Sequence, residues 1–278
     1  MKIQELLFPD KKICAEPQMY YHVTNSCHCA FKDDMPQMAL KKGTVLNADT
    51  YFNSFSYAKW KKYTGIKCFR LRLRVQGSMV VRIVGKNITK NYQLENREIS
   101  SHKFQNIKEE IVIPIKGRSE DTVICFEITA LEDSCFMGGY YEIIEERELA
   151  PCKIAIDICT FKRELYVERN MKMLTDYLIE NQKSSLFHNL FIYIQDNGQT
   201  LDKSKIESNY IKITPNRNTG GVGGFTRGML NILDDKEEKN FTHILLMDDD
   251  AVINPHAIEK MAVFLQLLLP QYKDKKIM

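Results

Sequence analysis

Three consecutive aspartates, Asp248, Asp249 and Asp250, follow an apolar run with the sequence FTHILLM. Side chains alternate along a strand, so Asp248 and Asp250 are expected to point one way and Asp249 the other. Neighbouring carboxylates repel each other unless a cation lies beside them, and oxygen-only ligation favours Mn²⁺ or Mg²⁺. We therefore predict a divalent metal on Asp248 and Asp250. The alternative is a helix N-cap cluster, but Asn254 and Pro255 already fill that role.

A glycine-rich segment, NTGGVGGFTRG, precedes a helix that we expect at Phe225–Leu233. Paired glycines permit left-handed backbone and let N–H groups approach an anion closely. The spacing matches neither a Walker A loop nor the dinucleotide fingerprint. We predict a phosphate-binding loop in which Arg227, one turn into the helix, reaches a diphosphate. The alternative is a flexible turn with a surface arginine. The loop glycines are Gly220, Gly221, Gly223 and Gly224.

Two other expected strands end in residues that suit a nucleotide. CTFKRE follows the first strand, where Thr160, Phe161 and Arg163 can meet a ligand and the guanidinium suits a base carbonyl or a phosphate. QDNG ends the second strand, and Asp196 could accept from a uracil N–H or a ribose hydroxyl. Asp-Asn-Gly is also a common turn, so the residues alone favour a turn at this second position.

From Lys153 onwards the expected elements alternate in type, which predicts an α/β domain with a mainly parallel sheet. All four motifs then lie at the carboxyl ends of strands, where such sheets place their ligand sites. Within the first helix Leu165, Glu168, Met171, Leu174 and Leu178 show near-helical spacing, with Glu168 as the one polar interruption. The expected order is strand 153–160, helix Glu164–Glu180, strand 190–195, strand Tyr210–Ile213, helix Phe225–Leu233, strand 243–247 and helix His256–Leu269.

Before residue 150 the pattern is that of short strands separated by Gly, Asn, Ser and Asp, which predicts a β-sandwich, jelly roll or barrel. We therefore expect two domains, an amino-terminal β-sandwich at 1–150 and an α/β domain at 151–278. The expected strands are 66–75, Met19–Thr24, Met79–Val84, Ile111–Ile115, Thr122–Ala130 and Tyr140–Ile144.

Two clusters in the first half leave alternatives open. The segment YFNSFSYAKWKKY, residues 51–63, could stack on sugars through its aromatic rings, but rings of this kind more often fill cores. The segment HVTNSCHC brings His22, Cys27, His28 and Cys29 close together in sequence. It lacks the paired spacing of zinc sites, so a plain loop is favoured over a metal site.

Composition narrows the class of protein. The formal net charge of +3 over 278 residues gives no support to nucleic-acid binding. The start lacks the apolar core of a signal peptide, and the most apolar run, Met261–Leu269, is too short to span a membrane. We expect a cytoplasmic protein with free thiols. Peripheral contact with the inner membrane face and assembly into an oligomer are both compatible with this expectation.

Together, CTFKR, QDNG, NRNTGGVGGFTRGM and HILLMDDDAVINPHAI resemble family-2 glycosyltransferases of the GT-A fold. Among these the chain resembles the galactofuranosyltransferases that build cell-wall galactan, which also carry an amino-terminal β-sandwich. The resemblance implies inverting, metal-dependent transfer from UDP-galactofuranose to a glycan or lipid-linked glycan acceptor. It implies metal contacts from Asp248 and Asp250 and donor contacts from the other motif residues, including Asp249. Lys162 departs from the family's usual uncharged residue.

Only 28 residues follow Asp250, whereas in the family the acceptor half of the domain follows the metal motif. We therefore expect an amino-terminal, donor-binding portion with the first half of a GT-A, Rossmann-like domain, whose catalytic base lies beyond residue 278. One alternative is a non-catalytic carbohydrate-binding or scaffolding protein with a decayed transferase half. A nucleotidyltransferase is another, although CTFKRE is not glycine-rich.

Overall fold

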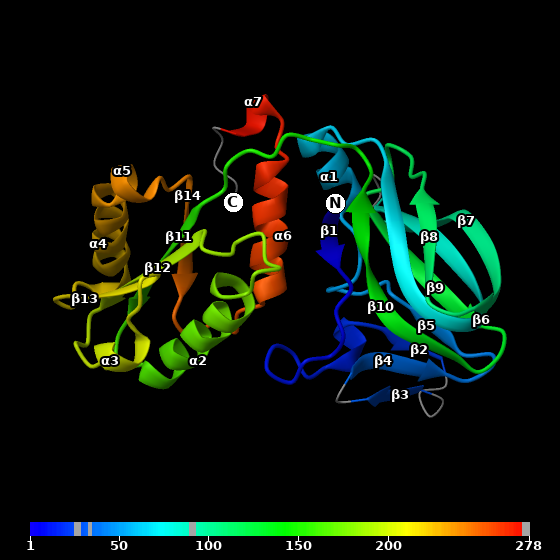
Figure 1. Ribbon diagram of the computed structural model, residues 1–278, viewed down its shortest axis with the longest axis horizontal. Helices are drawn as coiled ribbons and strands as arrows, with labels where there is room; N and C mark the ends of the chain where they lie inside the picture. Colours follow the sequence, from blue (N-terminus) through cyan, green and yellow to red (C-terminus); the bar gives the residue numbers. More distant parts are fainter. Residues whose placement is uncertain (25–28, 33–34, 89–92, 274–278) are drawn as a thin grey trace. The chain divides into compact units, whose positions relative to one another are not determined.

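The computed structural model describes residues 1–24, 29–32, 35–88 and 93–273. The chain divides into two compact units, shown in Figure 1. Unit 1 comprises Met1–Glu148 together with Leu268–Met278, and unit 2 comprises Leu149–Leu267. The return of the last residues to unit 1 was not part of the sequence prediction.

Unit 1 is built from antiparallel strands that form a large, curled, sandwich-like sheet, which confirms the β-rich character predicted for the first half. The path of neighbouring strands is β2-β5-β9-β6-β10-β4-β3, with β1 on β10 and with β7 and β8 on β6. Its strands are β1 (Lys2–Glu5), β2 (His22–Val23), β3 (Cys29–Lys32), β4 (Met35–Leu40), β5 (Val45–Asn47), β6 (Phe69–Ile88), β7 (Leu94–Ile107), β8 (Glu110–Ile115), β9 (Val123–Ala130) and β10 (Ser134–Ile143).

Strand β6 joins the two layers of this unit. Its first half pairs with β8 and β10, and its second half pairs with β7 and β9. The prediction of two separate strands at 66–75 and Met79–Val84 is therefore wrong, because both segments belong to the single strand β6. Gly77 lies at the change of layer with φ of 106°, and a Cβ there would overlap the side chain of Ser134. A glycine thus marks a bend inside one strand, because only glycine tolerates that backbone and that approach.

The aromatic segment packs into the core of unit 1. Phe55 is fully buried, stacks on Tyr141 with ring centroids 4.6 Å apart, and lies 6.3 Å from the Trp60 ring. Tyr57 is also buried, whereas Tyr51 is exposed. The packing interpretation of this segment is therefore confirmed for its buried rings. Nearby, the strand predicted at Met19–Thr24 is reduced to β2, because Pro17–Met19 forms a 3₁₀ turn.

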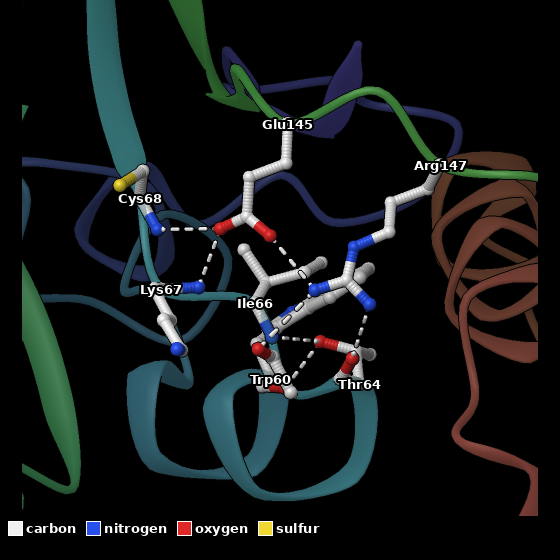
Figure 2. Close-up of polar contacts among 8 residues, drawn as sticks. Trp60, Thr64, Ile66, Lys67, Cys68, Glu145 and Arg147 are labelled. Atoms are coloured by element: carbon white, nitrogen blue, oxygen red, sulfur yellow. Dashed lines mark hydrogen bonds and ion pairs between the residues drawn. The ribbon is translucent and has the colours of Figure 1, made fainter.

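Helix α1 (Tyr57–Thr64) is fastened to the segment that leaves β10 (Figure 2). Gly65 caps the helix in the left-handed conformation. Arg147 donates to the carbonyls of Thr64 and Gly65 at 3.4 and 3.3 Å and to the Glu145 carboxylate at 2.7 Å. Glu145 in turn accepts from the backbone N–H groups of Lys67 and Cys68. A cation at a helix C-terminus satisfies carbonyls that have no partner within the helix. Arg147 therefore holds the end of α1, and Glu145 holds the backbone that leads from α1 into β6.

Unit 2 contains a parallel four-stranded sheet in the order β13-β12-β11-β14. Its strands are β11 (Ile154–Thr160), β12 (Leu190–Asp196), β13 (Ile211–Pro215) and β14 (His243–Asp248). Its helices are α2 (Glu164–Leu174), continued by a π-helical turn at Thr175–Ile179, α3 (Lys203–Ile206), α4 (Gly220–Asp234), α5 (Lys236–Lys239) and α6 (Pro255–Gln266). The short α7 (Pro270–Lys273) belongs to unit 1.

The helices of unit 2 cover both faces of this sheet, with α4 on one face and α2 and α6 on the other (Figure 1). Two details differ from the expected helices. The helix expected at Glu164–Glu180 changes to a π-helical turn after Leu174, and Leu165, the first residue of the near-helical spacing, is 80% exposed. Met171, Leu174 and Leu178 of the expected spacing are buried, and the buried face also includes Val167, Asn170 and Met173.

Helix α4 lies unusually close to the central strand β11. A Cβ at Gly224 would overlap the Cys159 thiol, and a Cβ at Gly228 would overlap the Asp157 carboxylate. Glycines four residues apart share one helix face, and strand residues two apart share one sheet face. The two glycines therefore let the helix backbone rest directly on these two side chains.

Gly228→Ala should lower the free energy of unfolding by about 1–3 kcal/mol, because the added methyl has no room without shifting α4 or Asp157. Urea unfolding of the full chain measures this loss. Gly221→Ala is the matched control, since a Cβ there meets nothing within 4 Å and alanine favours a helix. Equal stability of the two variants would contradict the close packing.

Candidate functional site

The strand order of unit 2 places a topological switch point beside β11. The chain runs from β11 outward to β12 and β13, and then returns to the other side of β11 as β14. In open parallel sheets, ligands bind at the carboxyl ends of the strands where the order reverses. At this edge lie the residues that follow β11, from Thr160 to Arg163, and those at the end of β14, from Asp248 to Asp250.

The three aspartates at the end of β14 have different surroundings. The Thr160 hydroxyl donates to the Asp249 carboxylate at 2.6 Å, and both residues are buried. Asp248 and Asp250 are exposed. Exposure therefore alternates along the three aspartates, as expected for side chains that point to opposite sides of a strand. The Thr160–Asp249 bond ties the end of β11 to the end of β14, next to the other two carboxylates, and donor contacts from Thr160 and Asp249 stay a prediction.

Asn170 also holds this loop, although the sequence analysis did not identify it. Its amide group donates to the backbone carbonyls of Asp249 and Ala251, each at 3.0 Å, and its side chain is almost fully buried. Arg169 donates to the same Ala251 carbonyl at 3.2 Å. The available signal was an amide residue in α2 one position before the apolar Met171, since a buried polar group needs specific partners.

The guanidinium of Arg163 lies against the acidic residues. It pairs with Asp250 and lies 3.7 Å from an oxygen of Asp249. The Asp250 carboxylate raises the pKa of Arg163 above its ordinary value. Both side chains of the Arg163–Asp250 pair are about half exposed, and exposed pairs of this kind contribute little because water screens them. A competing cation or anion can therefore separate the pair at low cost.

The turn between β11 and α2 also presents an aromatic ring. Phe161 is 48% exposed, and the ammonium of Lys162 lies 5.3 Å from its centroid. Lys162 itself has a positive φ of 55°, which is uncommon outside glycine and clusters at functional sites. Phe161 and Arg163 thus flank the same edge as the aspartates.

The glycine segment is helical, which corrects the predicted loop. Helix α4 begins at Gly220, five residues before the expected Phe225, and contains Gly220, Gly221, Gly223 and Gly224. Gly220 has a φ of 74°, and a Cβ at Gly220 or Gly221 would meet nothing within 4 Å. In the described part of the chain, the N-cap residue Thr219 makes no side-chain capping bond. The N–H of Gly220 donates to the Asn218 side chain at 3.0 Å, so the accessible N–H groups of the helix start are those that follow it, and Gly224 serves packing instead.

Asn197 joins the β12 turn to the start of α4. Its amide donates to the Gly220 carbonyl at 3.2 Å and its oxygen accepts from Asn216 at 2.8 Å. Asp196 is only 2% exposed, and its carboxylate accepts from the backbone N–H groups of Gly198 and Leu201. The geometry therefore uses Asp196 in its own turn, and its contact with a nucleotide stays a prediction. Arg227 is exposed on α4.

Asp157 is a buried carboxyl beneath α4. It is 0% exposed, and among the described residues neither of its oxygens meets a hydrogen-bond donor. Burial raises the pKa of Asp157 to about 7 because the charged form is desolvated. Burial also raises the pKa of the Cys159 thiol, with the carboxylates of Asp157 and Asp249 adding to the effect. The packing of α4 on β11 should thus depend on whether the Asp157 carboxyl and the Cys159 thiol are ionised.

Two places in the sequence were considered for a metal, the aspartates at the end of β14 and the cysteine and histidine cluster at residues 22–29. Within the described ranges, no group of three or more His, Cys, Asp or Glu side chains is gathered for a metal. Asp248 and Asp250 therefore form at most a partial ligand set. Of the cysteine and histidine cluster, Cys27 and His28 lie outside the described residues and the side chain of Cys29 is not described.

Comparison with known proteins identifies the family. The family model described as galactofuranosyltransferase 2 N-terminal matches residues 3–141, half of the 278-residue chain. The chain belongs to this galactofuranosyltransferase family. It is also similar to the galactofuranosyltransferase GlfT2 of Mycobacterium tuberculosis, at 24% identity over 220 residues. That match covers 75% of this chain and 33% of the relative, so the chain spans about a third of its relative's length.

Solved structures resemble the chain only weakly. The CBM22-1–GH10 modules of Clostridium thermocellum xylanase 10B give a TM-score of 0.33 at 7% identity, covering 71% of this chain and 38% of that one. The CBM22-1 xylan-binding domain of Paenibacillus barcinonensis Xyn10C gives 0.31 at 5% identity, covering 52% and 98%. At these scores the likenesses carry no argument about this chain.

Among the described residues, no helix combines the length and the apolar character needed to cross a membrane.

Asn170→Ala should lower the free energy of unfolding by roughly 1–3 kcal/mol, because the buried carbonyl of Asp249 loses its donor and the carbonyl of Ala251 keeps only Arg169. It should also speed amide hydrogen exchange in 249–252, whereas a purely global effect would speed exchange throughout unit 2. Hydrogen exchange followed by mass spectrometry separates these cases. Asn181→Ala is the control, since Asn181 is partly exposed and bonds only within its own turn. Unchanged exchange at 249–252 would contradict the anchoring role.

Asp157 should make stability depend on pH. Its folded pKa, about 7, lies above the ordinary value near 3.9, so the folded state holds the proton more tightly. The contribution of Asp157 to the free energy of unfolding should therefore be greatest below about pH 4, fall by up to about 1.4 kcal/mol per unit as pH rises towards 7, and then level off. Urea unfolding across this range measures the fall. Asp157→Asn should abolish it and the exposed Asp234→Asn should not; a fall that persists in Asp157→Asn would assign it to other groups.

Proposed function

We propose that this chain is the donor-binding portion of a glycosyltransferase that uses UDP-galactofuranose to extend a cell-surface glycan by inverting, divalent-metal-dependent transfer. Membership of the galactofuranosyltransferase family supports the reaction class. The observation that carries the assignment of the site is the shared edge at the switch point, where the turn after β11, the end of β14 and an exposed aromatic ring come together. The acceptor in this proposal is a glycan or a lipid-linked glycan.

Asp248 and Asp250 would hold Mn²⁺ or Mg²⁺. Their carboxylates are hard oxygen ligands of the kind that these cations prefer, and both are exposed on a loop that Asp249 and Asn170 hold in place. The residues therefore fit the group, with donor oxygens and water left to complete the shell. When bound, the cation supplies charge neutralisation for the diphosphate that leaves.

Arg163 would exchange its partner when a donor binds. In the free chain it balances the charge of Asp250. Once a cation takes over that balance, the guanidinium is available to the base or the phosphates of the nucleotide. The low strength of an exposed pair makes this exchange inexpensive. Phe161, two residues earlier, would pack against the nucleotide base.

The start of α4 would hold the diphosphate. A helix N-terminus offers N–H groups and the positive end of the helix dipole, and Gly220 and Gly221 leave the backbone open to close approach. The Gly220 N–H is bonded to the Asn218 side chain, so the diphosphate would accept from the N–H groups after it. Asn197 positions this helix start through the Gly220 carbonyl. Arg227 would add a positive charge one turn further along. We assign no general base to this chain, and we place the reaction on the cytoplasmic side, with peripheral membrane contact.

Calorimetric titration of the full chain with UDP tests the proposal. UDP should bind in the presence of Mn²⁺ and much more weakly in EDTA. Asp248→Asn and Asp250→Asn should each weaken Mn²⁺-dependent binding about ten- to hundredfold, since a contact to a charged group contributes about 1.5–3 kcal/mol. Asp176→Asn, an exposed aspartate on the π-helical turn, is the matched control and should bind like the unaltered chain.

The result that would overturn the proposal is equal UDP affinity with and without Mn²⁺, or no binding by a sample whose unfolding transition shows that it is folded. Tighter binding of CDP or GDP than of UDP would retain a nucleotide site and reject the uridine assignment. Equal weakening in Asp176→Asn and Asp248→Asn would reject the metal ligands.

A further inference from the structure

A groove of about 290 Å³ crosses the outer face of the unit 1 sheet. The strands β5, β9, β6 and β7 are hydrogen-bonded neighbours in that order, and Figure 1 shows them side by side. Its floor is formed by Val84 and Cys125, which face each other directly across β6 and β9. Burial raises the pKa of the Cys125 thiol to about 12, so the floor carries no charge. The volume lies just below the usual range of ligand pockets, about 300–1,000 Å³.

The walls of the groove are polar side chains that are already fixed in place. Arg82 pairs with Glu127 and lies 3.7 Å from Glu98. Asn47 donates to the other oxygen of Glu127 at 2.9 Å. Because these groups stand on adjacent strands in register, with Arg82 directly opposite Glu127, a ligand would not have to order them.

The charges of the groove nearly balance each other. Besides the Arg82 pairs, Lys86 pairs with Asp49 and Arg97 pairs with the buried Asp121. Each cation of the walls therefore has a carboxylate against it. Counted with these partners, three cations face four carboxylates, because Arg82 lies against both Glu98 and Glu127, so the net charge is only −1. Such a groove has little field to attract a phosphate, a nucleic acid or a metal cation, so the ligand class that it suits is uncharged.

Paired guanidinium and carboxylate groups suit hydroxyl groups in particular. Arg82 has five N–H donors, and the carboxylates of Glu98 and Glu127 have further lone pairs, so donors and acceptors lie side by side at the rim. A sugar hydroxyl both donates and accepts and can bridge such a pair. The uncharged floor suits the C–H face of a sugar ring. The nearly balanced charge, the fixed planar groups and the apolar floor thus all match one class of ligand.

We propose that this groove is a binding site for a neutral, hydroxyl-rich glycan, with Arg82 and Glu127 as its central contacts. The site deepens the proposed function, because it assigns glycan recognition to unit 1, and it rests on that function for the choice of sugar. The donor site of unit 2 and the glycan site of unit 1 are separate sets of residues on separate strands.

The test titrates the full chain with a neutral galactofuranose tetrasaccharide, using calorimetry and saturation-transfer NMR. Arg82→Ala should weaken binding about tenfold, and Glu127→Gln should weaken it by a similar factor. Arg82→Lys keeps the charge without the planar fork and should fall between Arg82→Ala and the unaltered chain. Arg74→Ala, at an exposed arginine on the same strand β6 but outside the groove, is the matched control and should stay within twofold.

Several results would overturn the inference. These are no saturable binding by the unaltered chain, equal affinity in Arg82→Ala and Arg74→Ala, and tighter binding of a sulfated tetrasaccharide than of the neutral one. UDP titration and thermal unfolding of each variant identify a variant that fails to fold, in which case Arg82→Lys decides the outcome. Loss of UDP binding with glycan binding intact would refute the proposed donor site and leave the glycan site standing.

Discussion

The contact between α4 and β11 is the constraint on which the rest of unit 2 depends. Gly224 and Gly228 remove the side chains that would hold the helix away, so the helix backbone rests on Cys159 and Asp157. This contact sets where the helix starts, and therefore where its N–H groups lie relative to the carboxyl ends of the strands. It also buries Asp157 without a hydrogen-bond donor among the described residues, a cost that helix and strand packing must offset.

Around the switch point, one set of residues is buried and holds the local backbone in place, and a second set is exposed and can contact a ligand. Thr160, Asp249 and Asn170 are buried and hold one another, while Asp248, Asp250, Phe161 and Arg163 face outward. A site that must bind charged groups reproducibly needs this second set of side chains to stand on a fixed base, and the hydrogen bonds of the first set provide it. The exposed Arg163–Asp250 pair balances charge at the edge without making the arrangement rigid.

Unit 1 uses charge in a different way. Its long strand β6 connects two layers, and much of its exposed face carries arginines paired with glutamates or aspartates, as at Arg70, Arg72 and Arg82. Paired charges keep a sheet face hydrated without producing a strong field. The two units thus suit different ligands, with three adjacent aspartates beside Arg163 at one sheet edge of unit 2 and nearly balanced charges across a sheet face of unit 1.

The sequence by itself determined the β-rich first half, the alternation of strands and helices after residue 150 and the residues at the ends of β11 and β14, because periodicity and strand-end chemistry are local. It also identified the family resemblance. Tertiary structure alone decided that Gly220–Gly224 are helical, that Gly224 and Gly228 serve packing, that Asp249 anchors while Asp248 and Asp250 are presented, and that Asn170 matters. Each depends on a neighbour far away in the chain, such as β11 beneath α4 or the Asp249 carbonyl above Asn170. A pattern within one segment carries no information about which distant side chain or backbone group will lie against it.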